Sequence, residues 1–190
     1  MIRLAIFASG SGSNAERIST YFENSSDVLV KCIVSNKKDA FVHERAKKLG
    51  VPSISFSRYD FCETDTVLNY LKENEIDYII LAGFLWLIPQ NLLTHYPNKI
   101  INIHPALLPA YGGKNMYGMN VHKAVIENRE KESGITIHYV NEKYDDGKTI
   151  FQATCNIDEN DTPESLAEKI HQLEYQYFPT TIEKVVLNNA

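Results

Sequence analysis

Asn102 and His104 lie two residues apart at the end of a short apolar segment, and Pro105 ends that segment. Alternation along a β-strand puts residues i and i+2 on one face, so both side chains should point the same way. An amide donor beside an imidazole could hold the negative oxygen formed when a nucleophile adds to a carbonyl. The structural alternative is that Asn102 caps a turn and His104 is an ordinary surface histidine. This segment alone leaves both interpretations open.

Two neighbouring carboxylates are candidates to act on such a histidine. Asp145 and Asp146 precede Gly147, a composition typical of a hairpin turn. One carboxylate beside His104 would raise the pKa of the imidazole and fix its tautomer, and the sequence does not choose between the two. Glu174 lies beside the apolar stripe of a predicted helix, where a lone glutamate is usually just solvated.

The segment 9–15 is a glycine-rich connection between a predicted strand and a predicted helix. Its small residues let backbone N–H groups approach an anion, and the helix N-terminus adds a favourable dipole. The pattern also matches a relaxed dinucleotide fingerprint, but residues 35–38 lack the acid that a nicotinamide enzyme would place on the ribose. We interpret the segment as a phosphate cradle for a mononucleotide-like group. The alternative is merely a tight strand-to-helix turn.

Composition narrows the class of protein. The 190 residues carry a net charge of −5, which leaves no basic surplus for nucleic acid. The three cysteines show no CxxC spacing, which favours a reducing compartment and argues against a metal site. With no signal peptide pattern and no apolar run long enough to span a membrane, we expect a cytoplasmic protein.

The first half alternates short apolar strands with amphipathic helices, a pattern typical of a parallel sheet covered on both faces. The expected strands are residues 2–8, 28–34, 51–54, 78–82 and 99–103. The expected helices are residues 14–24, 40–49 and 64–73.

The second half begins with an irregular Pro- and Gly-rich loop at 105–118 and a short helix at 119–128. Strands at 133–140 and 149–156 should form an antiparallel hairpin, and a capping-box pattern at 161–164 begins the last helix. The predicted fold class is therefore α/β. It is a Rossmann-like, mostly parallel twisted sheet with helices on both faces and a C-terminal antiparallel hairpin plus helix.

Taken together, residues 10–14, 81–84 and 102–109, the Asp145 loop and Glu174 resemble the folate-dependent formyltransferase family. The resemblance spans residues 2 to about 187 and is greatest to the enzymes that formylate glycinamide ribonucleotide in purine biosynthesis. It implies a single formyltransferase domain over residues 1–190. A phosphate/nucleotide-binding half would occupy residues 1–100 and a catalytic, folate-binding half residues 101–190.

The resemblance also implies roles for single residues. Gly12, Ser13 and Asn14 would bind the substrate phosphate. Asn102 and His104 would polarise the formyl oxygen, and Asp145 would keep His104 protonated and oriented. Glu174 would contact the glycinamide. The folate-binding residues would be Leu85, Trp86, Leu87, Ile88, Asn102, Asn141, Glu142, Tyr144 and Asp145.

The implied reaction is direct transfer of the formyl group from 10-formyltetrahydrofolate, as co-substrate, to the amine of glycinamide ribonucleotide, without a metal. The partners would be these small molecules, and neither nucleic acid nor a membrane would bind. The protein would be a monomer or a weak homodimer. Alternatives are a formyltetrahydrofolate hydrolase, a sugar-nucleotide formyltransferase or, outside this class, a non-catalytic nucleotide-binding protein.

Three positions depart from the family pattern. Several relatives have an arginine where this chain has Trp86, and many have a histidine where it has Asn120. The loop at 113–117 is longer than in the shortest relatives. Arg58 lies near the folate side but does not align with the arginine that some members use there.

Overall fold

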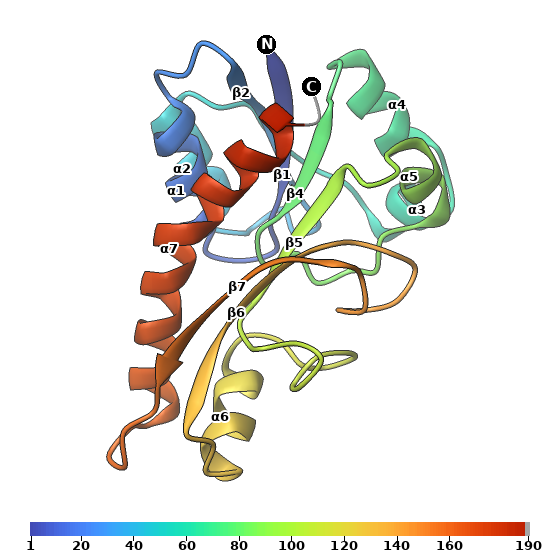
Figure 1. Ribbon diagram of the computed structural model, residues 1–190. Coiled ribbons are helices and arrows are strands. Elements are labelled where there is room, and N and C mark those ends of the chain that lie inside the picture. The colour runs from blue at the N-terminus through green and yellow to red at the C-terminus, as the bar shows by residue number, and fades with distance from the viewer. Residues whose placement is uncertain (189–190) are drawn as a thin grey trace.

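A seven-stranded sheet forms the centre of the protein in the computed structural model, which describes residues 1–188 (Figure 1). The strand order is β3-β2-β1-β4-β5-β6-β7. Neighbours from β3 to β5 are parallel, and β6 and β7 pair antiparallel. The predicted parallel sheet with its appended hairpin is confirmed. The strands are Ile2–Phe7 (β1), Val28–Ser35 (β2), Ser53–Ser55 (β3), Tyr78–Leu81 (β4), Ile100–His104 (β5), Glu132–Tyr139 (β6) and Thr149–Asn156 (β7).

Helices cover both faces of the sheet because successive side chains of its strands point to opposite faces. In β1, Leu4 and Ile6 pack under α1, α2, α6 and α7, while Ala5 and Phe7 pack under α3, α4 and α5. All four side chains are fully buried. The helices are Ser13–Phe22 (α1), Val42–Leu49 (α2), Arg58–Cys62 (α3), Thr66–Glu73 (α4), Gln90–His95 (α5), Met119–Glu127 (α6) and Pro163–Asn188 (α7).

The short helices α3 and α5 were not predicted, because five and six residues are too few to show a helical period. Helix α3 begins at a capping box in which the Ser57 hydroxyl accepts from the Asp60 N–H and the Asp60 carboxylate accepts from the Ser57 N–H. This capping box was the one sequence signal that could have predicted the start of α3.

Helix α7 begins where the sequence predicted, but with a different partner. Thr162 Oγ1 accepts from the Ser165 N–H at 3.2 Å, and Ser165 Oγ accepts from the Thr162 N–H at 2.9 Å. Ser165, and not Glu164, therefore completes the capping box. The helix continues through Pro179, which leaves the Tyr175 carbonyl without its usual helical donor. Arg17 Nε of α1 donates to that carbonyl at 3.0 Å and ties the two helices together.

The chain reverses its direction across the sheet at β1. Strands β2 and β3 lie on one side of β1, and β4 and β5 lie on the other. In open α/β sheets, ligands bind in the crevice that such a reversal leaves beyond the carboxyl ends of the strands. Among the described residues, no helix combines the length and apolarity that crossing a membrane requires.

Candidate active site

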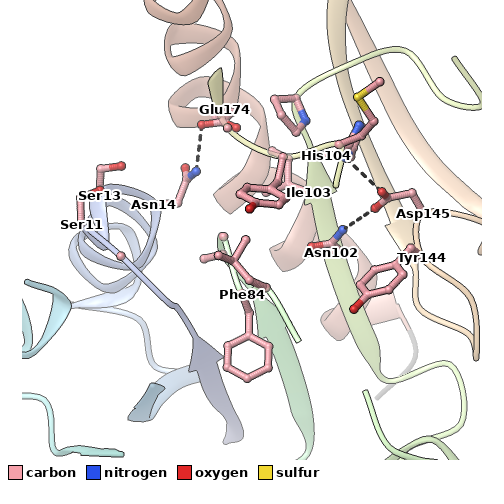
Figure 2. Close-up of a pocket in the computed structure, with 18 of the residues that line it drawn as sticks. Ser11, Ser13, Asn14, Phe84, Asn102, Ile103, His104, Tyr144, Asp145 and Glu174 are labelled. Atoms are coloured by element: carbon pink, nitrogen blue, oxygen red, sulfur yellow. Dashed lines mark hydrogen bonds and ion pairs between the residues drawn. The ribbon is translucent and has the colours of Figure 1, made fainter. Parts of the chain in front are cut away.

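A cleft of about 430 Å³ lies at the carboxyl ends of β1, β4 and β5. The glycine loop after β1 forms one wall, and the end of β5 and the Asp145 loop form the opposite wall (Figure 2). Side chains of α6 and α7 reach the cleft from the same face of the sheet. The topology thus brings together segments that are up to 160 residues apart in the chain, as in the hydrogen bond between Asn14 and Glu174.

Asn102, His104 and Asp145 meet in this cleft, as the family resemblance implied (Figure 2). His104 Nδ1 lies 3.5 Å from Asp145 Oδ2, and Asn102 Nδ2 lies 3.5 Å from Asp145 Oδ1. The His104 side chain is 4% exposed and that of Asp145 is 11% exposed, so water screens their interaction weakly. The arrangement joins an amide, an imidazole and a carboxylate.

His138, which the sequence did not single out, completes this cluster from β6. Its Nδ1 donates to the backbone carbonyl of Tyr139 at 2.8 Å, and its Nε2 lies 3.0 Å from Asn102 Nδ2. Antiparallel pairing places Asn102 opposite His138. A register for the predicted strands would have shown this neighbour.

Burial opposes the charge on His104. Its pKa lies below the ordinary value because desolvation outweighs the opposite effects of the Asp145 carboxylate and the Tyr111 carbonyl. The expectation that Asp145 keeps His104 protonated is therefore only half right. The carboxylate raises the pKa of His104, but in the unliganded protein the lowering effect of burial is larger.

The structure also separates the two adjacent aspartates. Asp145 adopts φ 54° and turns into the cleft, where Gly113 N–H donates to Oδ2 at 2.9 Å. Burial raises the pKa of Asp145, but the His138 and His104 imidazoles and this N–H together hold it below its usual value. Asp146 is exposed and accepts instead from Asn141 Nδ2 at 3.2 Å. Asp145 is thus the carboxylate that lies beside His104.

The glycine loop approaches α2 too closely for a side chain. Gly12 has φ 75° and precedes the first turn of α1, and a Cβ there would lie 2.3 Å from Val42 Cγ2. Val42 N–H donates to Gly10 O, and Arg45 Nε donates to Ser11 O. The loop is therefore fixed, and Gly12, Ser13 and Asn14 at the start of α1 line the cleft. The first N–H groups of a helix have no helical acceptor, so this position suits an anion.

Glu174 is buried and not solvated. Only 6% of it is exposed, and its Oε2 accepts from Asn14 Nδ2 at 2.9 Å (Figure 2). Burial raises its pKa, against the opposing effects of Asn14 and His171. Asn14 Oδ1 is buried without a hydrogen bond, which leaves an acceptor for a substrate N–H or O–H group. The pair can therefore both donate to and accept from a bound molecule.

Some predicted folate-binding residues line the cleft and others do not. Leu85, Asn102, Tyr144 and Asp145 line it. Trp86 packs against Phe61 and Phe84, and Arg58 lies over the Trp86 ring at 5.7 Å. Outside the lining lie Trp86, Leu87, Ile88, Asn141 and Glu142.

His122 and His171 are further cleft residues that the sequence did not identify. Burial, with a smaller effect of His171 and then His104, lowers the pKa of His122 to about 4, and its Nδ1 makes no hydrogen bond. Asn120 donates to Asn115 O at 3.2 Å, which closes the 113–118 loop on α6. No group of three or more His, Cys, Asp or Glu residues suited to a metal occurs within residues 1–188.

Comparison with known proteins decides the family. A match to the formyl transferase family covers residues 2–182. The chain belongs to the formyl transferase family. The phosphoribosylglycinamide formyltransferase of Bacillus subtilis is 39% identical to this formyl transferase. The match covers 100% of this chain and 97% of the Bacillus subtilis protein.

A chloroplastic phosphoribosylglycinamide formyltransferase of Arabidopsis thaliana is 41% identical over 93% of this formyl transferase, which spans 62% of that relative. The crystal structure of glycinamide ribonucleotide transformylase 1 from Geobacillus kaustophilus superposes with a TM-score of 0.88 at 37% identity. That match covers 97% of this formyl transferase and 98% of the other chain. The expected family and fold class are confirmed.

Proposed function

We propose that this chain transfers the formyl group of 10-formyltetrahydrofolate to the primary amine of glycinamide ribonucleotide in purine biosynthesis. The observation that carries the proposal is the meeting of Asn102, His104 and Asp145 in one cleft with a phosphate-type loop at its opposite wall. The names of the relatives support the same reaction.

The substrates would lie along the cleft between these two walls. The phosphate would bind the N-terminus of α1 at Gly12, Ser13 and Asn14, and Glu174 would contact the glycinamide. The pterin would lie beside Leu85 and Tyr144, two exposed side chains that face the cleft. Residues 1–100 would thus supply the phosphate loop and residues 101–190 the reacting groups, within a single domain.

The reaction would proceed by direct attack. The neutral amine of the substrate adds to the formyl carbon, and the formyl oxygen becomes negative. The bond to the folate nitrogen then breaks, and the proton lost by the amine goes to that leaving nitrogen. Asn102 Nδ2 donates to the negative oxygen, and a well-placed donor of this kind lowers the barrier by about 3 kcal/mol. Binding the phosphate far from the reacting atoms orients the amine.

His104 would act through Nδ1, because Nε2 already donates to the carbonyl of Tyr111 at 2.7 Å. The 3.5 Å separation between Nδ1 and Asp145 is long for a hydrogen bond. In the charged ring, Nδ1–H can donate to the formyl oxygen or to a water that relays the proton. In the neutral ring, whose single proton lies on Nε2, Nδ1 can only accept. Negative charge on the formyl oxygen would favour the charged imidazole and offset the burial.

The test is an assay of the purified protein with 10-formyltetrahydrofolate, with and without glycinamide ribonucleotide. The proposal predicts loss of the formyl group only when the amine is present. Loss without the amine would instead identify a hydrolase, and loss with an amino sugar nucleotide alone would identify a sugar-nucleotide formyltransferase. Sedimentation of the same sample tests our further expectation of a monomer or weak homodimer. We also expect a cytoplasmic location.

A further inference from the structure

One short turn, Tyr111 to Gly113, contacts both members of the His104–Asp145 pair. The Tyr111 carbonyl accepts from His104 Nε2 at 2.7 Å, and the Gly113 N–H donates to Asp145 Oδ2 at 2.9 Å. Between them, a Cβ on Gly112 would lie 3.2 Å from Asp145 Cβ and 2.5 Å from Leu108 Cδ2. The turn therefore packs directly against the pair, and its position sets theirs.

Tyr111 itself has an unfavourable backbone conformation for a residue with a side chain. Its φ is 56°, in the left-handed region that residues other than glycine, asparagine and aspartate rarely adopt. Such a conformation persists only where other contacts enforce it.

Those contacts come from the Tyr111 side chain. Its phenol donates to Glu130 Oε1 at 2.6 Å and accepts from Asn128 Nδ2 at 2.9 Å. Both partners follow α6, and neither lines the cleft. The ring also packs against the core on that face of the sheet. Tyr111 is thus fixed at one end by the segment after α6 and contacts His104 at its other end.

We propose that Tyr111 is a positioning residue whose phenol, held by Glu130 and Asn128, keeps its backbone carbonyl on Nε2 of His104. This carbonyl selects the imidazole nitrogen that faces the reacting groups, because an acceptor at Nε2 leaves Nδ1 toward the cleft. The assignment of a catalytic consequence rests on the proposed function.

The test begins with Tyr111→Phe, which keeps the ring and removes both hydrogen bonds of the phenol. We expect kcat for formyl transfer to fall by about tenfold while KM for both substrates stays within about twofold. The pKa of His104, followed by NMR of its imidazole nitrogens, should fall, because a displaced acceptor at Nε2 stabilises the charged ring less. Asp145, His138 and His122 are the titratable groups around that ring, and all three are retained.

Two variants of Glu130 test the hydrogen bond that its carboxylate accepts from the Tyr111 phenol. Glu130→Gln keeps an oxygen that accepts from the phenol and should behave like the wild-type protein, whereas Glu130→Ala should reproduce the losses of Tyr111→Phe. The matched control is Tyr21→Phe, because Tyr21 donates to Glu183 at 2.7 Å in a second tyrosine–glutamate pair between α1 and α7, away from the cleft. This control should leave kcat and the His104 signals unchanged.

An unchanged kcat with unchanged His104 signals in Tyr111→Phe, or an equal loss in Tyr21→Phe, would overturn the proposal. The NMR titration needs no substrate. If the wild-type protein transfers no formyl group but the His104 signals respond as described, then the proposed function fails and the positioning role of Tyr111 stands.

Discussion

At the residue scale, Asp145 is the junction of the site. Its two oxygens face His104, His138, Asn102 and the Gly113 N–H, so one carboxylate lies beside both candidate donors of the reaction. Buried carboxylates are stable as anions only when such partners surround them. Asp146, its neighbour in sequence, has none of these contacts and is exposed.

Substitution of each aspartate in turn shows which of the two carboxylates matters for formyl transfer. Asp145→Asn removes the negative charge beside His104, and we expect kcat for formyl transfer to fall by about 100-fold. Asp146→Asn should change kcat by less than about twofold, because its carboxylate lies at the surface. Steady-state assays of both variants, with circular dichroism to verify folding, check the result. Equal losses would show that charge in the loop, and not contact with His104, matters.

At the element scale, the turn from β1 to α1 is the place where we propose that the phosphate binds. The turn has no room for a side chain at Gly12, because Val42 of α2 packs against it. At Gly10, by contrast, a Cβ would meet nothing within 4 Å. The two glycines of the sequence pattern therefore have different requirements.

Gly12→Ala should destabilise the protein by about 1–3 kcal/mol, because alanine is strained at φ 75° and collides with Val42. The displaced loop should also raise KM for the phosphorylated substrate by about tenfold. Gly10→Ala is the control for stability and should leave the free energy of unfolding nearly unchanged. Urea unfolding measures the stability, and substrate titration measures KM. A normal KM in Gly12→Ala would argue that the phosphate binds elsewhere.

At the scale of the whole molecule, burial of polar groups around the cleft makes stability depend on pH. His122 has a pKa of about 4 in the folded protein and 6.5 as its ordinary value, chiefly because burial disfavours its charged form. The unfolded chain therefore binds the proton more readily. This contribution to stability is complete above about pH 6.5 and is lost as the pH falls toward about 4.

His122→Gln removes this titration. Between about pH 7 and about pH 4.5, the free energy of unfolding of the wild-type protein should fall by roughly 2–3 kcal/mol more than that of the variant. Urea unfolding at both pH values gives the difference, and the other titrating groups cancel in it. Parallel losses in the two proteins would mean that folding does not shift the pKa of His122.

The order of strands and helices could be predicted because hydrophobic periodicity is a local property. Long elements such as β2 and α7 show it over eight or more residues, whereas α3 and α5 are too short to do so. Asn102 and His104 could be paired for the same reason, since alternation along one strand puts them on one face. Through the family resemblance, Asp145 and Glu174 could also be connected to them.

Neighbours across the sheet could not be predicted, because register and burial depend on the whole molecule. His138 and the Tyr111 carbonyl contact the site only because β6 pairs with β5 and the 105–113 loop folds back over it. The direction in which the pKa of His104 shifts could not be predicted either. The residue types suggested an ion pair with Asp145, and only the folded protein shows that desolvation outweighs the effect of that carboxylate. Local pattern thus placed Asn102 and His104 on one face of a strand, while tertiary packing decided which atoms they face and which protonation state burial favours.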